Sequence, residues 1–268
     1  MGGDIDDALA IAMALNAAEL DVIGISTVYM GNEWRTDLVK RMMAAYDRED
    51  IPVYRGAETP LIGLWDKEKP KAAPANEAVP ALIAAARSNP GLTVVAIGPL
   101  TNIALAIAVA PDIVASVRLF IMGGMILTPH PEWNIQCDPE ASQMVMTCSG
   151  DITLLGLDVT EQCRLNKEES LALVAGDSKK SSFLRGEMER FLNSFSFLPT
   201  LHDPLTIAAL LWEDILSYEM MDVQVETRGA LTRGITAVQR FSERKPVRVA
   251  TAVKAIEATN RMKALIMA

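Results

Sequence analysis

Short runs of apolar and β-branched residues alternate with helix-forming segments over most of this 268-residue chain. Such runs at residues 21–29, 92–97 and 116–122 are separated by predicted helices. Strands are continuously apolar when helices cover both faces of a parallel sheet. The alternation therefore predicts an α/β fold of Rossmann-like type, with an open, mostly parallel sheet and helices on both faces. In this architecture ligands bind in the loops at the carboxyl ends of the strands.

The predicted elements continue toward the C-terminus, where their character changes. Helices are predicted at residues 7–20, 34–46, 78–88, 101–109, 139–148, 167–175, 181–194 and 204–211, and further strands at residues 51–54 and 152–157. Three short runs between turn residues, at 221–226, 235–239 and 247–250, predict a small antiparallel C-terminal addition. A hydrophobic content of 50% suits one large core, so we expect a single domain spanning residues 1–268.

Composition and charge argue against several classes of protein. A formal net charge of −9 without a basic stripe argues against a nucleic-acid partner. No apolar run reaches the roughly 18 to 20 residues that span a bilayer, and acids stand where a secretory signal has basic residues. The three cysteines lack C-x-x-C spacing and indicate no disulfide framework. We therefore expect a cytoplasmic protein that binds neither nucleic acid nor membranes.

Three carboxylates stand within four residues near the start of the chain, at Asp4, Asp6 and Asp7. At this spacing like charges repel one another unless a positive group lies among them. A divalent cation would satisfy them, and ligands that are all oxygen favour Ca²⁺ or Mg²⁺ over zinc. Acids at a helix start also complement the macrodipole and cap free N–H groups, so a purely structural role is the alternative.

The same acidic segment opens a series of motifs that extends over nearly the whole chain. The series consists of DIDDALAIAMAL (4–15), ISTVYMGN (25–32), VYRGAETPL (53–61), AIGPLTNIALAI (96–107), FIMGGMILTPHPEWNIQCDPEAS (120–142), GLDVT (156–160) and LHDPLTIAAL (201–210). In kind and in order these motifs resemble those of the metal-dependent nucleoside hydrolases. The resemblance implies the nucleoside hydrolase fold and Ca²⁺-dependent hydrolysis of the N-glycosidic bond of ribonucleosides to free base and ribose.

The resemblance also implies roles for individual residues. The implied Ca²⁺ ligands are two carboxylates and one main-chain carbonyl, those of Asp7, Asp203 and Ile97. The implied substrate-binding residues are Asp6, Asn32, Glu132, Asn134 and His202. Asp6 and His202 are also the implied catalytic residues, and His202 is expected to donate a proton to the departing base. Without the resemblance, Glu132 and Asn134 would suggest an exposed polar loop and His202 a structural histidine.

The sequence departs from the family pattern in three places. An asparagine expected near Met125 and a histidine expected on the loop between residues 63 and 74 have no counterpart, which leaves the nucleobase preference open. The family's Asp-x-Asp strand precedes the glycine turn, here Gly2 and Gly3, so we expect a missing first central strand upstream of Met1. A metal ligand and the water-activating base are expected there too, so activity is expected to be impaired unless Asp4 substitutes.

Two other functions remain open at this level. A nucleoside- or ribose-binding relic would keep Asp6, Glu132 and Asn134 but lack hydrolytic activity. A phosphate-handling α/β enzyme would use the turn at residues 98–102, although the chain has neither GxxxxGK[ST] nor GxGxxG. By resemblance we expect a homodimer or homotetramer acting on a small-molecule nucleoside, with the helix at residues 205–212 offering an exposed apolar surface.

Overall fold

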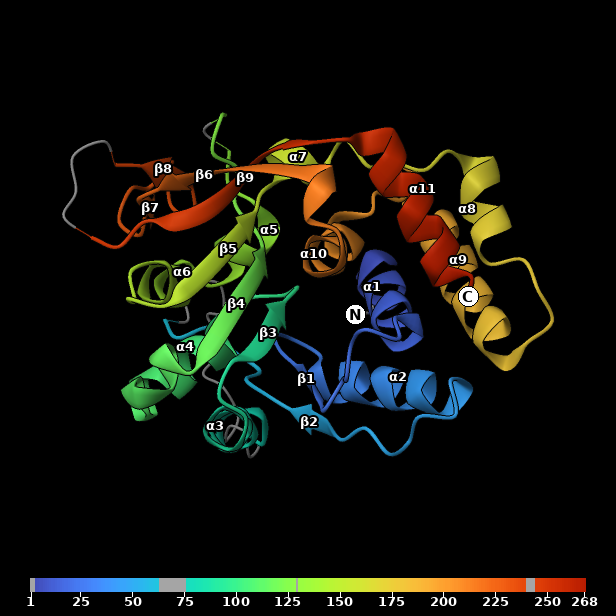
Figure 1. Ribbon diagram of the computed structural model, residues 1–268, viewed down its shortest axis with the longest axis horizontal. Helices are drawn as coiled ribbons and strands as arrows, with labels where there is room; N and C mark the ends of the chain where they lie inside the picture. Colours follow the sequence, from blue (N-terminus) through green and yellow to red (C-terminus); the bar gives the residue numbers. More distant parts are fainter. Residues whose placement is uncertain (1–2, 63–75, 129, 240–243) are drawn as a thin grey trace.

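The computed structural model describes residues 3–62, 76–128, 130–239 and 244–268 (Figure 1). Within these residues the largest sheet has five strands in the order β3-β4-β5-β9-β6. They are β3 (Leu92–Ala96), β4 (Val117–Met122), β5 (Asp151–Leu155), β9 (Val247–Val253) and β6 (Leu216–Met221). Neighbouring strands from β3 to β9 are parallel, and β6 runs antiparallel to β9 at one edge. The prediction of an open, mostly parallel sheet is confirmed.

Two small ladders accompany this sheet in the described part of the chain. β1 (Ile25–Thr27) pairs in parallel with β2 (Val53–Arg55). β7 (Val223–Val225) pairs antiparallel with β8 (Thr236–Val238), which is the small addition that the sequence predicted. Among the described residues β1 forms a ladder only with β2, and β3 only with β4. The expectation of a further central strand stays a prediction.

One strand assigned to the antiparallel addition was placed wrongly. Residues 247–250 form part of β9, which lies between β5 and β6 in the central sheet. Val247, Val249 and Ala250 are all buried, because helices and the small ladder cover this strand. A short apolar run does not reveal its pairing partner, since pairing depends on residues far away in the chain.

Helices cover both faces of the central sheet (Figure 1). They are α1 (Asp6–Asn16), α2 (Asn32–Ala45), α3 (Ala78–Ser88), α4 (Thr101–Val109), α5 (Trp133–Cys137), α6 (Pro139–Met146), α7 (Leu157–Thr160), α8 (Lys167–Leu173), α9 (Lys179–Ser194), α10 (His202–Leu211) and α11 (Ala255–Ile266), with the 3-10 turns η1 (Pro111–Ala115) and η2 (Glu213–Ile215). Phe120 and Leu155 join the core formed with α1 and α10, whereas Leu119, Ile121 and Leu154 join the core formed with α4 and α6. Successive strand residues point to opposite faces, and burial of both faces explains the continuous apolar runs.

Helix α10 is internal, which corrects the expectation of an exposed apolar surface at residues 205–212. Leu205 and Ala208 are fully buried and Ile207 is nearly so. The helix packs against α1, α11 and β4 (Figure 1). A helix that is apolar on all sides is normally a core helix, so its composition serves packing within the subunit. None of the described helices combines the length and apolarity needed to cross a membrane.

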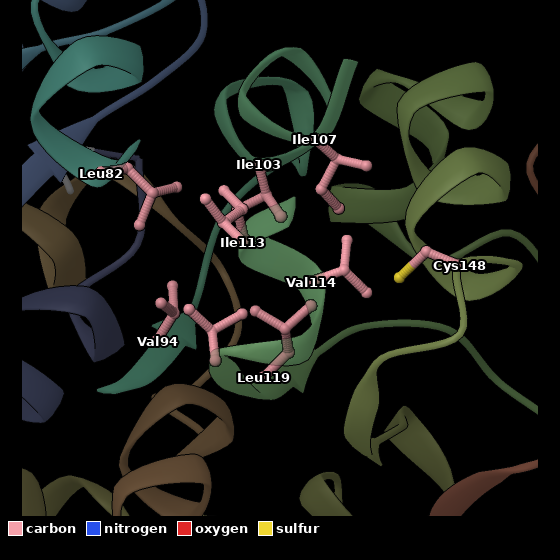
Figure 2. A pocket seen from close by; sticks show the side chains of 9 residues that line it. Leu82, Val94, Ile103, Ile107, Ile113, Val114, Leu119 and Cys148 are labelled. Atoms are coloured by element: carbon pink, nitrogen blue, oxygen red, sulfur yellow. The ribbon is translucent and has the colours of Figure 1, made fainter. Parts of the chain in front are cut away.

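A small apolar pocket lies in the core that the sheet forms with α4 and α6, on the face opposite α10 (Figure 2). Side chains of α3, α4, η1, β3 and β4 line it, among them Leu82, Val94 and Ile113, together with the thiol of Cys148. Among the described residues, the lining offers no carboxylate, amide or imidazole that could orient a polar ligand. The pocket is therefore a packing feature of the core.

Candidate functional site

Three carboxylates converge where the N-terminal ends of two helices meet. Asp6 and Asp7 begin α1, and Asp203 is the second residue of α10. One carboxylate oxygen from each residue lies within 4.8 Å of the others. The two helices pack against each other, which brings Asp203 to Asp6 and Asp7 from the far end of the sequence. The structure thus brings together the two carboxylates implied as metal ligands, Asp7 and Asp203.

Burial makes this arrangement of charges costly without a cation. Asp6 is 6% exposed and Asp203 is 3% exposed. Burial, followed by the charges of neighbouring carboxylates, raises the pKa of both groups well above the usual range. Burial also raises the pKa of Asp4 nearby. The positive ends of the α1 and α10 dipoles offset part of the repulsion. A hard divalent cation would neutralise these buried charges and would find in the carboxylates the oxygen ligands that it prefers.

Glu132 and Asn134 form a second polar group beside the strand ends of β3 and β4. Glu132 is buried and caps α5: its Oε1 accepts from the Asn134 N–H at 2.8 Å, and its Oε2 accepts from the N–H groups of Ile135 and Gly124 at 3.0 and 3.1 Å. Burial raises the pKa of Glu132, while these three hydrogen bonds oppose the rise. The alternative of an exposed polar loop is wrong for both residues, since Asn134 is buried as well.

The Asn134 side chain connects this group to the implied carbonyl ligand. Its Nδ2 donates to the Met122 carbonyl at 3.2 Å and contacts the Ile97 carbonyl at 3.4 Å. Ile97 directly follows β3, so its carbonyl lies at the carboxyl end of that strand. Ile97, Glu132 and Asn134 therefore form one hydrogen-bonded group.

Asn32 begins α2 and is fully buried. Its Nδ2 donates to the Gly56 carbonyl at 2.8 Å, which fixes the orientation of the amide. Among the described residues its Oδ1 has no hydrogen-bond partner. A buried acceptor without a partner costs free energy in the folded protein, so this oxygen is available to a bound hydroxyl or N–H group.

Two buried residues support the site and were missed from the sequence. Asn102 accepts from the Ala57 N–H at 2.8 Å and donates to the Thr27 carbonyl at 3.0 Å, joining α4 to β1 and to the segment that follows β2. Asp138 accepts from the Thr101 hydroxyl at 2.7 Å and from the Leu61 N–H at 2.9 Å. Each lies inside a quoted motif, so the motif was a signal, but its side-chain partners required the fold.

His202 is the first residue of α10 and is next to Asp203 in sequence. Its Nδ1 lies 2.7 Å from the hydroxyl of Thr160, the last residue of α7. Burial, with a smaller effect of Arg164, lowers the pKa of His202 to about 4. The imidazole is therefore neutral near pH 7 and offers one N–H donor and one acceptor. The loop at residues 63–74, where a second histidine was expected, lies outside the described residues.

Comparison with known proteins places this site in a family. Residues 1–260 match the family model described as inosine-uridine preferring nucleoside hydrolase. A probable uridine nucleosidase 2 of Arabidopsis thaliana is 32% identical over 89% of this chain and 85% of its own length. A pyrimidine-specific ribonucleoside hydrolase of Citrobacter koseri is 33% identical over 88% of this chain and 85% of its own length.

Solved structures agree with the sequence comparisons. A plant nucleoside hydrolase superimposes with a TM-score of 0.87 at 27% identity, covering 100% of this chain and 97% of that one. A purine-preferring ribonucleoside hydrolase from Gardnerella vaginalis also has a TM-score of 0.87, at 25% identity, covering 100% and 98%. Fold and site thus define an enzyme of the class that hydrolyses the N-glycosidic bond of nucleosides. Within that class, the chain belongs to the inosine-uridine preferring nucleoside hydrolase family.

Proposed function

We propose that this protein hydrolyses ribonucleosides to free base and ribose in a calcium-dependent reaction. The observation that carries the proposal is the convergence of Asp6, Asp7 and Asp203 within 4.8 Å at two buried helix ends. Family membership supports nucleoside hydrolysis, and the donor chemistry supports a hard cation.

In this proposal the carboxylates of Asp7 and Asp203 and the main-chain carbonyl of Ile97 hold the Ca²⁺ ion. These are hard oxygen donors, which suit Ca²⁺ better than a softer transition metal. A bound Ca²⁺ supplies acidification of water at neutral pH and a fixed point for sugar hydroxyls. Asp6 then accepts a hydrogen bond from a ribose hydroxyl, and its charge stabilises the positive charge that develops on the ribosyl ring.

The remaining ribose contacts come from buried acceptors and donors. Asn32 offers its unpartnered Oδ1, while its Nδ2 stays bonded to Gly56. Glu132 uses three of its four acceptor positions on backbone N–H groups, which leaves one on Oε1. Asn134 stands beside Glu132 with its amide held against Met122. Groups arranged in this way reject a sugar that lacks the matching hydroxyl, because a buried partner would be left unpaired.

His202 is proposed to stand beside the leaving base. With its pKa lowered to about 4, the neutral ring donates a hydrogen bond from an N–H rather than a proton from an imidazolium ion. Such a donor stabilises negative charge as it develops on the departing base. The role expected for His202, donation of a proton to the departing base, thus becomes donation of a hydrogen bond from a neutral ring N–H.

Hydrolysis is tested by incubating the protein with inosine, uridine, adenosine and cytidine in Ca²⁺ and measuring base and ribose. The expected result is equal amounts of the two products, with strong loss in Asp6→Asn and Asp203→Asn. Asp177→Asn, an exposed acid in the turn before α9, is the matched control and should retain the rate. Nucleoside binding without product would contradict the proposal and support the binding-relic alternative.

Assembly and location are part of the same proposal. We propose a homodimer or homotetramer, as the resemblance implies, although the apolar surface expected on helix α10 is buried inside the subunit. Light scattering from the purified protein measures the subunit number, and a monomer would contradict this part. A cytoplasmic location is proposed from the composition and is tested by cell fractionation.

A further inference from the structure

A buried threonine hydroxyl is directed at the imidazole of His202. Thr160 is fully buried at the end of α7, and its Oγ1 lies 2.7 Å from His202 Nδ1. The two helices pack against each other, so the contact joins two elements that are distant in sequence. Within the described residues, no other hydrogen-bond partner is found for the Thr160 side chain or the His202 ring.

The buried Thr160 hydroxyl requires an acceptor for its proton, and this requirement decides which of the two groups is the donor. If the hydroxyl donates to Nδ1, its single proton is satisfied and the ring proton resides on Nε2. If Nδ1–H donated instead, the buried hydroxyl proton would need a second acceptor. The Gly156 carbonyl, one turn earlier, already accepts from the N–H groups of Val159 and Thr160 at 3.2 Å. The first arrangement satisfies the proton of the fully buried hydroxyl and leaves the Nε2–H on His202, which is only partly buried and open to solvent or a ligand, so this arrangement is favoured.

We propose that Thr160 is a positioning residue that holds His202 in the tautomer with its proton on Nε2. Nδ1 and Nε2 point to different sides of the ring, so the N–H is directed away from Thr160. It is then available to hydrogen-bond a bound nucleobase, a consequence that rests on the proposed function. The tautomer itself is a property of the free protein and does not depend on any substrate.

The tautomer is measured by nitrogen NMR of protein carrying ¹⁵N-labelled histidine. The chain has only two histidines, and His130 is exposed, so His130→Gln assigns the His202 signals by removing the others. We expect a protonated, pyrrole-type signal at Nε2 and an unprotonated, pyridine-type signal at Nδ1. A protonated Nδ1 in the wild-type protein would overturn the proposal without any variant.

Variants of Thr160 connect the tautomer to catalysis. Thr160→Val removes the hydroxyl at nearly constant volume and is expected to mix the tautomers and lower kcat about ten- to a hundredfold, with little change in KM. Thr160→Ser keeps the hydroxyl and should restore both the spectrum and most of kcat. Thr147→Val, which removes a hydroxyl that donates to the Gln143 carbonyl at the end of α6, is the matched control and should change neither.

The two readouts separate this inference from the proposed function. Wild-type protein without nucleoside hydrolysis would refute the proposed function, while the His202 spectrum would still decide the role of Thr160. An unchanged spectrum or an unchanged kcat in Thr160→Val would overturn the positioning role. If Thr160→Val does not fold, as judged by its thermal unfolding, Thr160→Ser and the wild-type spectrum still carry the test.

Discussion

Replacing Asp203 with asparagine is expected to stabilise the metal-free protein and, at the same time, to abolish its stabilisation by calcium. Asparagine has the shape of aspartate without its charge, so the change isolates electrostatics from packing. Asp203 is buried beside Asp6, and burial, followed by the charges of Asp6 and Asp7, raises the pKa of Asp203. Removing one charge therefore relieves repulsion when no cation is bound and removes a ligand when one is.

The size of the effect follows from the geometry. The carboxylate oxygens lie within 4.8 Å of one another, and two unit charges at that upper limit repel by about 3.5 kcal/mol at an effective dielectric constant of about 20. Screening by the helix dipoles and by nearby solvent reduces the relief to about 1 to 3 kcal/mol. In a chain of this size that raises Tm by about 2 to 6 °C. Calcium at a hundred times its Kd should stabilise the wild-type protein by about 2.7 kcal/mol and the variant very little.

The assay is thermal unfolding in chelator and in excess calcium. The order of the two Tm values is expected to reverse: the variant is higher in chelator, and the wild-type protein is higher in calcium. Asp177→Asn removes an exposed acid and should follow the wild-type protein in both conditions. A variant that melts below the wild-type protein in chelator, or gains the same calcium shift, would refute the electrostatic reasoning.

Three further predictions concern groups around the site and in the core. Gly56→Ala should lower stability by about 1 to 3 kcal/mol, because an added Cβ would overlap Asn102. Gly186→Ala, where α9 has open space for a Cβ, should raise stability by about 0.5 to 1 kcal/mol. Equal Tm changes in the two variants would contradict this prediction. Glu132→Gln should leave an α5 N–H group without an acceptor, lower stability by about 1 to 3 kcal/mol and raise KM. An unchanged Tm would show that the Glu132 cap is dispensable. Burial raises the pKa of Cys163 to about 11, so only about a thousandth of the Cys163 side chains are thiolates at pH 8. Iodoacetamide reacts with the thiolate and should label half-buried Cys148 before Cys163. Equal labelling rates of the two cysteines in the native protein would contradict this prediction.

Local patterns predicted much of the fold. The helices at residues 78–88 and 101–109 have the predicted bounds, because both are apolar helices between strands with clear turns. Helix α11 was missed, although Ala258, Met262 and Ile266 lie four residues apart and are all buried. That spacing was a sufficient signal. The sequence of strand β6, LSYEMM, gave no such signal. It mixes polar and apolar residues because β6 is an edge strand with much of its surface exposed.

The site was predictable only through the order of its motifs. Neither periodicity nor composition could show that Asp7 and Asp203 meet, since that depends on α1 packing against α10. The sequence also could not show that Glu132 caps α5, because capping depends on where the side chain turns. The Thr160 contact with His202 was hidden for the same reason, although both residues lie within quoted motifs.

The most direct test of the central claim is product release from a nucleoside by metal-stripped protein before and after calcium is restored. Asp7 and Asp203, with the main-chain carbonyl of Ile97, are predicted to hold the ion that the reaction requires. The expected result is release of base and ribose in equal amounts that begins only when calcium is added. Release at the same rate in chelator, or none with calcium at saturation, would contradict it.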